Sequence, residues 1–361
     1  MSGIQNHIEK ISKTVEEWLR PDNHQLKDAI ERTAGESFFN FEDIKHRILV
    51  LKHSLNQKKL EKWAKTSNLR ENSLRDKDVL CLHAGNLPLV GIQDLLAVVM
   101  AGGSYSGKIS RKDPYLLQTI LSLLDVNGLL PNSHWSTQIS DLSGRNSDAL
   151  LFAGSEQSVD GVLQTVQKLK ILKPEAHKLM RTAHFSIAYI TNHEPQTMED
   201  LTESIFRYGG AGCRSVAIVV APVHLDSQKC LFTDYVEAFW LNNPQHEKPP
   251  KSLFHRFAYN KAMEISQAWL NDFLIEETLL KPEKKFILHW VKGNFETVQK
   301  IVNQFQNGLQ SVYSTAEYIG KQIGEFRIEP LSEAQSPPVW WKPDQVDTIE
   351  WLQTHIGKSA N

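Results

Sequence analysis

One cysteine stands directly behind a glycine-rich turn, and this arrangement is the one in the chain best suited to covalent chemistry. Gly209, Gly210 and Gly212 follow an amphipathic run that ends at Tyr208, and Cys213 comes next. Glycine adopts positive φ angles at no steric cost and leaves backbone N–H groups accessible beside the sulfur. Such donors stabilise a thiolate, or the oxyanion that forms when a thiolate attacks a carbonyl carbon. We therefore predict that Cys213 is a nucleophile that accepts an acyl group; the alternative is a small buried residue under a turn.

Three polar turns upstream of this cysteine each follow a predicted strand. The predicted strands are 79–82, 104–109 and 149–152, and the polar residues at or after their ends are Asn86, Lys108, Ser110, Arg111, Gly154 and Ser155. Because the carboxyl ends of parallel strands meet at one edge of a sheet, we expect these turns to face a common ligand. An amide suits a developing oxyanion, cations favour NADP over NAD, and N–H groups at a helix start bind phosphate. The alternatives are a turn asparagine, solvated surface charges and a helix N-cap.

Alternating strands and helices must position these residues, so we predict an α/β fold with a mainly parallel, doubly wound sheet. The first 75 residues differ, because apolar residues recur there every three to four positions and indicate helices. The predicted helices are 4–19, one from about 25, 41–55, 57–66, 91–101, 115–125, 159–168, 234–240, 252–273, 295–305 and 344–355. The predicted strands after 152 are 184–190, 216–221, 286–291 and 308–313.

The composition and charge of the chain exclude several classes of protein. The chain has 361 residues, of which 41% are hydrophobic and 23% charged, and a net charge of −2. The near-neutral charge argues against nucleic acid or an anionic membrane as a partner, and no run is long and apolar enough for an integral membrane protein. The 14 histidines show no metal-ligand spacing, so we predict no metal site. Cys81, Cys213 and Cys230 are too few for a disulfide framework and suit a reducing cytoplasm; we expect Cys81 and Cys230 in the core.

Four segments together resemble the LuxC-type acyl-CoA reductase family, a branch of the aldehyde dehydrogenase superfamily. They are His83-Ala-Gly-Asn-Leu-Pro-Leu-Val-Gly-Ile-Gln-Asp-Leu-Leu96, Gly107-Lys-Ile-Ser-Arg-Lys-Asp-Pro114, Phe152-Ala-Gly-Ser155 and Gly209-Gly-Ala-Gly-Cys213. Their order and spacing match over roughly residues 78–340, which is far more specific than any one segment. The residues before this region match only by position. The chain is short for the family, so we expect a trimmed lid or arm.

The resemblance implies an aldehyde dehydrogenase-like fold, with a cofactor-binding doubly wound sheet, an α/β catalytic domain and an N-terminal helical region. We predict the helical region at 1–75, the NADP-binding domain at 76–183 and the catalytic domain with Cys213 at 184–315. Residues 316–361 are expected to pack back on the cofactor domain or to form an oligomer interface. The family also implies a homo-oligomer.

The resemblance further implies an activity, the NADPH-dependent reduction of an acyl-CoA or acyl thioester to the aldehyde through an acyl-cysteine. Cys213 takes the place of the acylated cysteine, and Asn86 that of an asparagine whose amide donates to the oxyanion. The implied cofactor residues are Lys108 at the adenosine ribose, Ser110 and Arg111 at the 2′-phosphate, and Gly154 and Ser155 at the pyrophosphate. The acyl donor, CoA or a partner protein that delivers the acyl group, is left open.

One departure from the superfamily carries mechanistic information. Hydrolytic aldehyde dehydrogenases keep a glutamate that activates water shortly before the strand that starts here at His184, but no Asp or Glu occurs between Glu175 and Glu194. Without that base the acyl enzyme is protected from water, which favours reduction, and His184 is the candidate acid or base. Two alternatives stay open: a protein that holds or transfers acyl groups on Cys213, and an interaction protein with an inert thiol.

Overall fold

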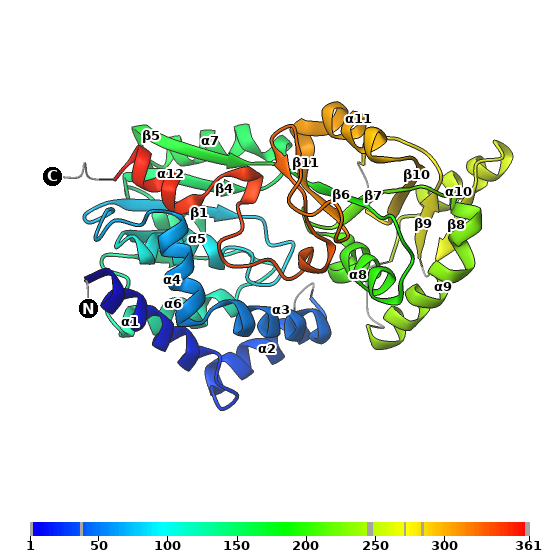
Figure 1. Cartoon of the computed structure of the whole chain (residues 1–361). Coiled ribbons are helices and arrows are strands. Elements are labelled where there is room, and N and C mark those ends of the chain that lie inside the picture. The colour runs from blue at the N-terminus through cyan, green and yellow to red at the C-terminus, as the bar shows by residue number, and fades with distance from the viewer. Residues whose placement is uncertain (1–2, 37–38, 244–247, 271, 283–284, 358–361) are drawn as a thin grey trace. The chain divides into compact units, whose positions relative to one another are not determined.

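The chain folds into two units, each built around its own sheet (Figure 1). Each unit also has its own clusters of buried apolar side chains. The computed structural model describes residues 3–36, 39–243, 248–270, 272–282 and 285–357. Unit 1 comprises residues 1–182 and 338–361, and unit 2 comprises residues 183–337. The helices predicted for residues 1–75 share the core of unit 1, and residues 316–337 belong to unit 2.

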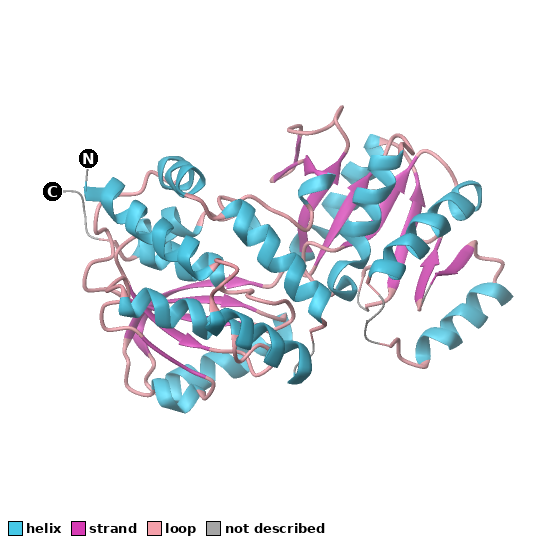
Figure 2. Ribbon diagram, turned by 90° about the horizontal axis from the view of Figure 1, so that it is seen from below, coloured by secondary structure: helices cyan, strands magenta, loops and turns pink. Residues whose placement is uncertain are grey.

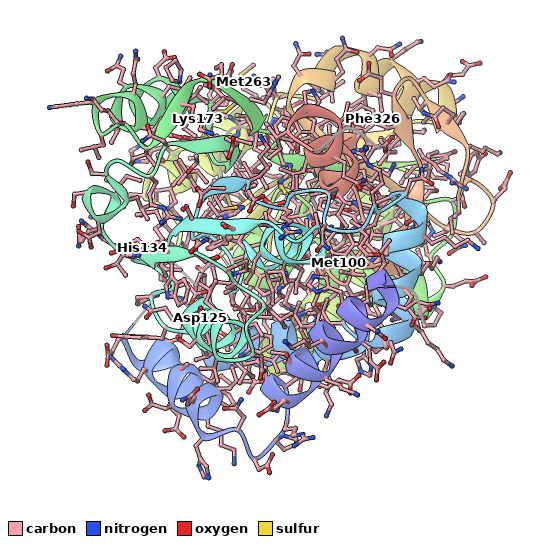
Figure 3. The ribbon with its side chains drawn as sticks, turned by 90° about the vertical axis from the view of Figure 1, so that its left-hand side faces the viewer. Met100, Asp125, His134, Lys173, Met263 and Phe326 are labelled. Carbon is pink, nitrogen blue, oxygen red and sulfur yellow. The ribbon has the colours of Figure 1, made fainter. Side chains whose placement is uncertain are left out.

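Unit 1 contains a five-stranded parallel sheet in the order β3-β2-β1-β4-β5, with helices packed against it (Figure 2). Its strands are β1 (Asp78–His83), β2 (Ser104–Lys108), β3 (His134–Ser136), β4 (Ser147–Ala153) and β5 (Leu172–Arg181). Its helices are α1 (Gly3–Trp18), α2 (His24–Glu36), α3 (Phe41–Ser54), α4 (Gln57–Thr66), α5 (Ile92–Met100), α6 (Leu116–Val126), α7 (Val159–Lys168) and α12 (Thr348–His355). In Figure 3, His134 and Lys173 mark the edge strands β3 and β5, and Met100 and Asp125 lie near the ends of α5 and α6.

The central strand β1 shows why this sheet is covered on both faces. Val79 and Cys81 belong to a buried cluster that includes residues of α1 to α6 and α12. Leu80 and Leu82 belong to a second cluster, which lies under α7. Successive side chains of a strand point to opposite faces, so a continuous apolar run requires helices on both sides. The prediction that Cys81 lies in the core is confirmed.

Unit 2 is built in the same way around a seven-stranded sheet in the order β14-β11-β6-β7-β10-β9-β8. Its strands are β6 (Phe185–Tyr189), β7 (Val216–Ala221), β8 (Gln267–Leu270), β9 (Phe273–Glu276), β10 (Ile287–Lys292), β11 (Leu309–Ser314) and β14 (Glu329–Pro330), with β12 (Gln322–Ile323) and β13 (Phe326–Arg327) as a separate hairpin. Its helices are α8 (Pro195–Phe206), α9 (Leu225–Asn242), α10 (Ser252–Ala262) and α11 (Phe295–Phe305). The strands from β14 to β9 pair in parallel, and β8 is antiparallel to β9.

Several sequence predictions need correction. The helix predicted at 252–273 is wrong, because α10 ends at Ala262 and Glu264 turns to a φ of +53° before β8 and β9 begin. The helix predicted at 234–240 is part of the longer α9. The strand β5 was not predicted, because its exposed positions carry charged and polar side chains, as is common for a strand at the edge of a sheet. Cys230 is exposed rather than in the core.

Among the residues that the structure describes, no helix has the length and apolar character needed to cross a membrane. Likewise, no group of three or more His, Cys, Asp or Glu side chains in the described ranges is placed to hold a metal ion.

Candidate active site

Cys213 follows a turn with three successive positive φ angles, the first at Tyr208 (+57°) and the next two at glycines. The helix α8 ends at Phe206, and the turn η3 (Arg207–Gly210) leads to the cysteine. Gly209 and Gly210 have φ angles of +62° and +68°, in the left-handed region that favours glycine. A Cβ atom on Gly210 would lie 3.1 Å from the carbonyl oxygen of Ile205, which is tight against backbone. The predicted sequence of helix, glycine-rich turn, thiol and buried strand is confirmed.

Two buried arginines fix the chain on either side of the thiol. At the start of the turn, Arg207 Nε donates to Glu203 Oε1 at 2.6 Å. After it, Arg214 Nε donates to the carbonyl oxygen of Ala334 at 2.7 Å. The Cys213 side chain between them is a half-buried thiol. Charge-assisted hydrogen bonds are stronger than neutral ones, so these two contacts restrain the chain on both sides of Cys213.

His184 and Cys213 lie at the same edge of the unit 2 sheet. Each precedes its strand, β6 or β7, and these strands pair in parallel with Ser186 opposite Val216. Ser186 Oγ donates to the carbonyl oxygen of Cys213 at 3.0 Å, which ties the start of β6 to the cysteine. The exposed His184 is held through its backbone N–H, which donates to the carbonyl oxygen of Gly308 at 3.1 Å.

A cavity of about 180 Å³ opens at this edge, between the glycine turn and the start of β10. It is lined by His184, Phe185, Ile205, Gly210, Ala211, Gly212, Ser215, Val216, Ala217, Phe273, Pro282, Lys285, Phe286 and Ile287. The apolar side chains suit an alkyl group, and Lys285 and His184 are its basic residues. No carboxylate is found among these lining residues. Sequence reasoning missed Phe273 and Phe286, because each precedes or begins a strand far along the chain from Cys213.

The turns predicted to bind a cofactor lie at one edge of the unit 1 sheet. Asn86 follows β1, Lys108 ends β2 and Gly154 follows β4, and these three strands are neighbours in parallel. The topology therefore brings the three turns to the carboxyl edge, where ligands of such sheets bind. Their individual roles stay predictions.

The residues after β2 fit an anionic group. Burial lowers the pKa of Lys108, and the positive charge of Arg111 lowers it further, so the two cations are close enough to repel each other. A phosphate at this point would relieve that repulsion. Arg111 Nη2 also donates to Gln138 Oε1 at 3.0 Å, and Ser110 Oγ accepts from the backbone N–H of Lys112 at 3.2 Å.

Packing against Phe152 favours the glycine after β4. A Cβ atom on Gly154 would lie 2.6 Å from Cζ of Phe152, so a larger residue there would displace the Phe152 ring. The exposed Ser155 donates through Oγ to Ser158 Oγ at 3.2 Å, within the turn that leads to α7. The N–H groups at the start of the helix are the feature of this turn that suits a phosphate. Gly154 itself adds no further support for a pyrophosphate site.

Comparisons with known proteins identify the fold. The sequence matches no protein-family profile and no curated protein. The structure is similar to aldehyde dehydrogenase 21 from Physcomitrella patens, with a TM-score of 0.67, 12% identity, and coverage of 99% of this chain and 85% of that one. It is also similar to methylmalonate-semialdehyde dehydrogenase (DddC) from Oceanimonas doudoroffii, with a TM-score of 0.65, 13% identity, and coverage of 95% and 80%. A third similar structure is succinic semialdehyde dehydrogenase from Streptococcus pyogenes in complex with NADP+, with a TM-score of 0.61, 12% identity, and coverage of 88% and 78%.

The chain has the aldehyde dehydrogenase fold. The predicted fold class is confirmed, and identities this low establish the fold alone. Membership of the LuxC-type branch stays a prediction.

Proposed function

We propose that this protein is an NAD(P)-dependent oxidoreductase that acts through Cys213, and that its reaction is the NADPH-dependent reduction of an acyl thioester to the aldehyde. The observation that carries the proposal is the half-buried thiol directly after a positive-φ glycine turn, on an aldehyde dehydrogenase fold, where the neighbouring Gly212 lines a cavity of mixed polarity. An inert structural cysteine does not require such a turn.

The chain's own residues account for the acylation step. The Cys213 thiolate attacks the thioester carbonyl carbon, a new C–S bond forms, and the oxygen takes up negative charge. The Asn86 amide and backbone N–H groups are proposed to donate to that oxyanion, each such donor contributing roughly 3–4 kcal/mol to transition-state stabilisation. When the carbonyl re-forms, the bond to the donor's sulfur breaks, and CoA or a carrier thiol leaves with a proton. His184, which lines the cavity, is the candidate to hold that proton.

Reduction requires a bound nicotinamide cofactor, which supplies the hydride. The tetrahedral alkoxide left on Cys213 would then collapse, break its C–S bond, and release the aldehyde and the Cys213 thiolate without taking up a proton; His184 or solvent can protonate the thiolate afterwards. Lys108, Ser110 and Arg111 are proposed to hold the 2′-phosphate end of NADPH, and Gly154 with Ser155 its pyrophosphate. A negative group between Lys108 and Arg111 is the part of this assignment that the charges support.

One feature of the sequence favours reduction over hydrolysis of the acyl enzyme. No Asp or Glu occurs between Glu175 and Glu194, where the superfamily keeps its water-activating glutamate. Homo-oligomerisation and an acyl-delivering partner are proposed on the family resemblance alone, and a cytoplasmic location on the small number of cysteines.

The test is incubation of the purified chain with acyl-CoA and NADPH while the absorbance of the reduced nicotinamide is followed. We expect oxidation that depends on acyl-CoA and is abolished in Cys213→Ala, with Cys81→Ala as a control for thiol loss elsewhere. Equal oxidation by Cys213→Ala and the wild type would refute the role of the thiol. Acylation of Cys213 that NADPH leaves unchanged would favour an acyl-holding protein instead.

A further inference from the structure

A buried ionic cluster lies at the carboxyl edge of the unit 1 sheet, and the proposed chemistry leaves it unused. His83 Nε2 donates to Asp94 Oδ2 at 2.7 Å. Arg181 Nη1 donates to both oxygens of Asp94, at 2.9 Å to Oδ1 and 2.8 Å to Oδ2, and its Nη2 donates to Thr348 Oγ1 at 2.7 Å. The cluster joins the ends of β1 and β5 to the first turns of α5 and α12.

This cluster is charged even though it is buried. The side chains of His83, Asp94 and Arg181 are only 8%, 5% and 5% exposed. Burial alone would raise the pKa of Asp94, but the charge of Arg181 and the hydrogen bond from His83 outweigh it and hold the pKa well below its ordinary value. The carboxylate is therefore ionised and only accepts, so His83 Nε2 carries the proton.

Stability is a poor reason for this arrangement. A buried ion pair is often no more stabilising than apolar side chains of the same size. Here the buried Nε atom of Arg181 also finds no hydrogen-bond partner among the described residues, which adds an unmet desolvation penalty. A cluster with such a cost is better explained by the geometry that it imposes.

The geometry concerns the loop that carries Asn86. His83 and Asp94 stand on either side of residues 84–91, so their hydrogen bond closes this loop at its base. The imidazole also rests on the end of the loop, because a Cβ atom on Gly91 would lie 2.7 Å from His83 Nδ1. Arg181 braces Asp94 through the second carboxylate oxygen as well as the first.

A second point of the same loop is fixed by the segment after β2. The backbone N–H of Leu89, which has a φ of +56°, donates to the buried Asp113 Oδ2 at 2.8 Å. A Cβ atom on Gly85 would overlap the Ser110 hydroxyl, so the two loops pack in direct contact. Asn86 is therefore held between two anchors, one of them ionic and buried.

We propose that Asp94 is a positioning residue, which together with His83 and Arg181 sets the place of the Asn86 loop and so the rate at which Cys213 is acylated. The catalytic half of this inference rests on the proposed function, whereas the positioning half concerns unit 1 alone. The two halves have separate readouts.

Hydrogen exchange measured by mass spectrometry tests the positioning half. We expect Asp94→Asn to speed amide exchange across residues 84–91, because the amide group cannot satisfy both His83 and Arg181. The matched control is Asp148→Asn, which removes the partner of Lys173 (2.7 Å) elsewhere in the same sheet and should leave this loop unchanged. Unchanged exchange in Asp94→Asn overturns the proposal. If Asp94→Asn does not fold, the pair His83→Ala and His83→Gln replaces it, and we expect only glutamine, which keeps a donor, to restore slow exchange.

A double-mutant cycle tests the catalytic half. The acylation of Cys213 is followed by intact-protein mass spectrometry after mixing with acyl-CoA alone. We expect Asp94→Asn to slow acylation about tenfold to a hundredfold in the wild-type background, and less than about twofold in Asn86→Ala. Equal loss in both backgrounds overturns the assignment, because a purely structural effect does not require Asn86. Absence of acylation in the wild type refutes the proposed function and this half with it, while the exchange result still decides the positioning of the loop.

Discussion

The paired variants Gly209→Ala and Gly210→Ala test at which of the two positions the turn before Cys213 needs glycine. Both positions have positive φ, so an added methyl costs roughly 1–2 kcal/mol in the left-handed region. Alanine recovers roughly 0.4–1 kcal/mol by reducing the freedom of the unfolded chain. At Gly209 no described atom lies within 4 Å of the added Cβ, so the net loss in unfolding free energy should lie between about 0 and 1.6 kcal/mol.

At Gly210 the same methyl meets an additional obstacle. It would lie 3.1 Å from the carbonyl oxygen of Ile205, in the last turn of α8, so backbone must move. A bond-angle or peptide-plane distortion of that kind adds about 1 kcal/mol. We therefore expect Gly210→Ala to lose about 2 kcal/mol of unfolding free energy, and to shift the N–H groups of the turn beside Cys213.

Two assays separate the effects. Urea denaturation gives the unfolding free energies, and the rate of Cys213 alkylation by iodoacetamide near neutral pH reports the state of the thiol. We expect alkylation close to the wild-type rate in Gly209→Ala and clearly slower in Gly210→Ala. Equal stability losses and equal alkylation rates for the two variants would show that the contact with Ile205 does not shape the turn.

Three further predictions follow from the charges and the cavity. Arg111→Glu removes one proposed charge-assisted partner of the NADPH 2′-phosphate, so it should raise the KM for NADPH at least about tenfold. The KM for NADH, which lacks that phosphate, should stay nearly unchanged. Lys112→Glu, the same charge change at the neighbouring residue, is the control. Phe273 lines the cavity next to the glycine turn, so Phe273→Leu, which enlarges the cavity, should move the kcat/KM optimum to longer acyl chains than in the wild type. Burial raises the pKa of Asp113 to about 6, so the folded state favours the protonated carboxyl. Its contribution to the unfolding free energy is therefore fully present below the unfolded pKa near 4 and is lost as the pH rises through about 6. The pKa shift corresponds to about 3 kcal/mol of unfolding free energy. Urea denaturation at several pH values between about 4 and 7 should therefore show that the unfolding free energy depends less on pH in Asp113→Asn than in the wild type.

Local pattern predicted most of what positions the candidate site. The apolar run 216–221, the glycines before Cys213 and the polar turns after 82, 108 and 152 are all features of neighbouring residues, and the structure places them as expected. The helix stripes of the first 75 residues were equally clear, because periodicity is read within a single element.

What the sequence could not predict depends on contacts between distant segments. Asp94 is an ordinary acidic residue in an apolar helix until β1, β5 and α12 bring His83, Arg181 and Thr348 to it. The one available signal was a charged side chain on the buried helix α5. The helix predicted at 252–273 failed for a related reason, since β8 and β9 are strands only because the sheet offers them partners.

Rapid-quench mass spectrometry of the wild type with acyl-CoA tests the central claim most directly. The account predicts one acyl group on the peptide that contains Cys213, and its release as aldehyde when NADPH is added. An acyl group on another residue, or no acyl group on Cys213 under conditions where aldehyde forms, would contradict it.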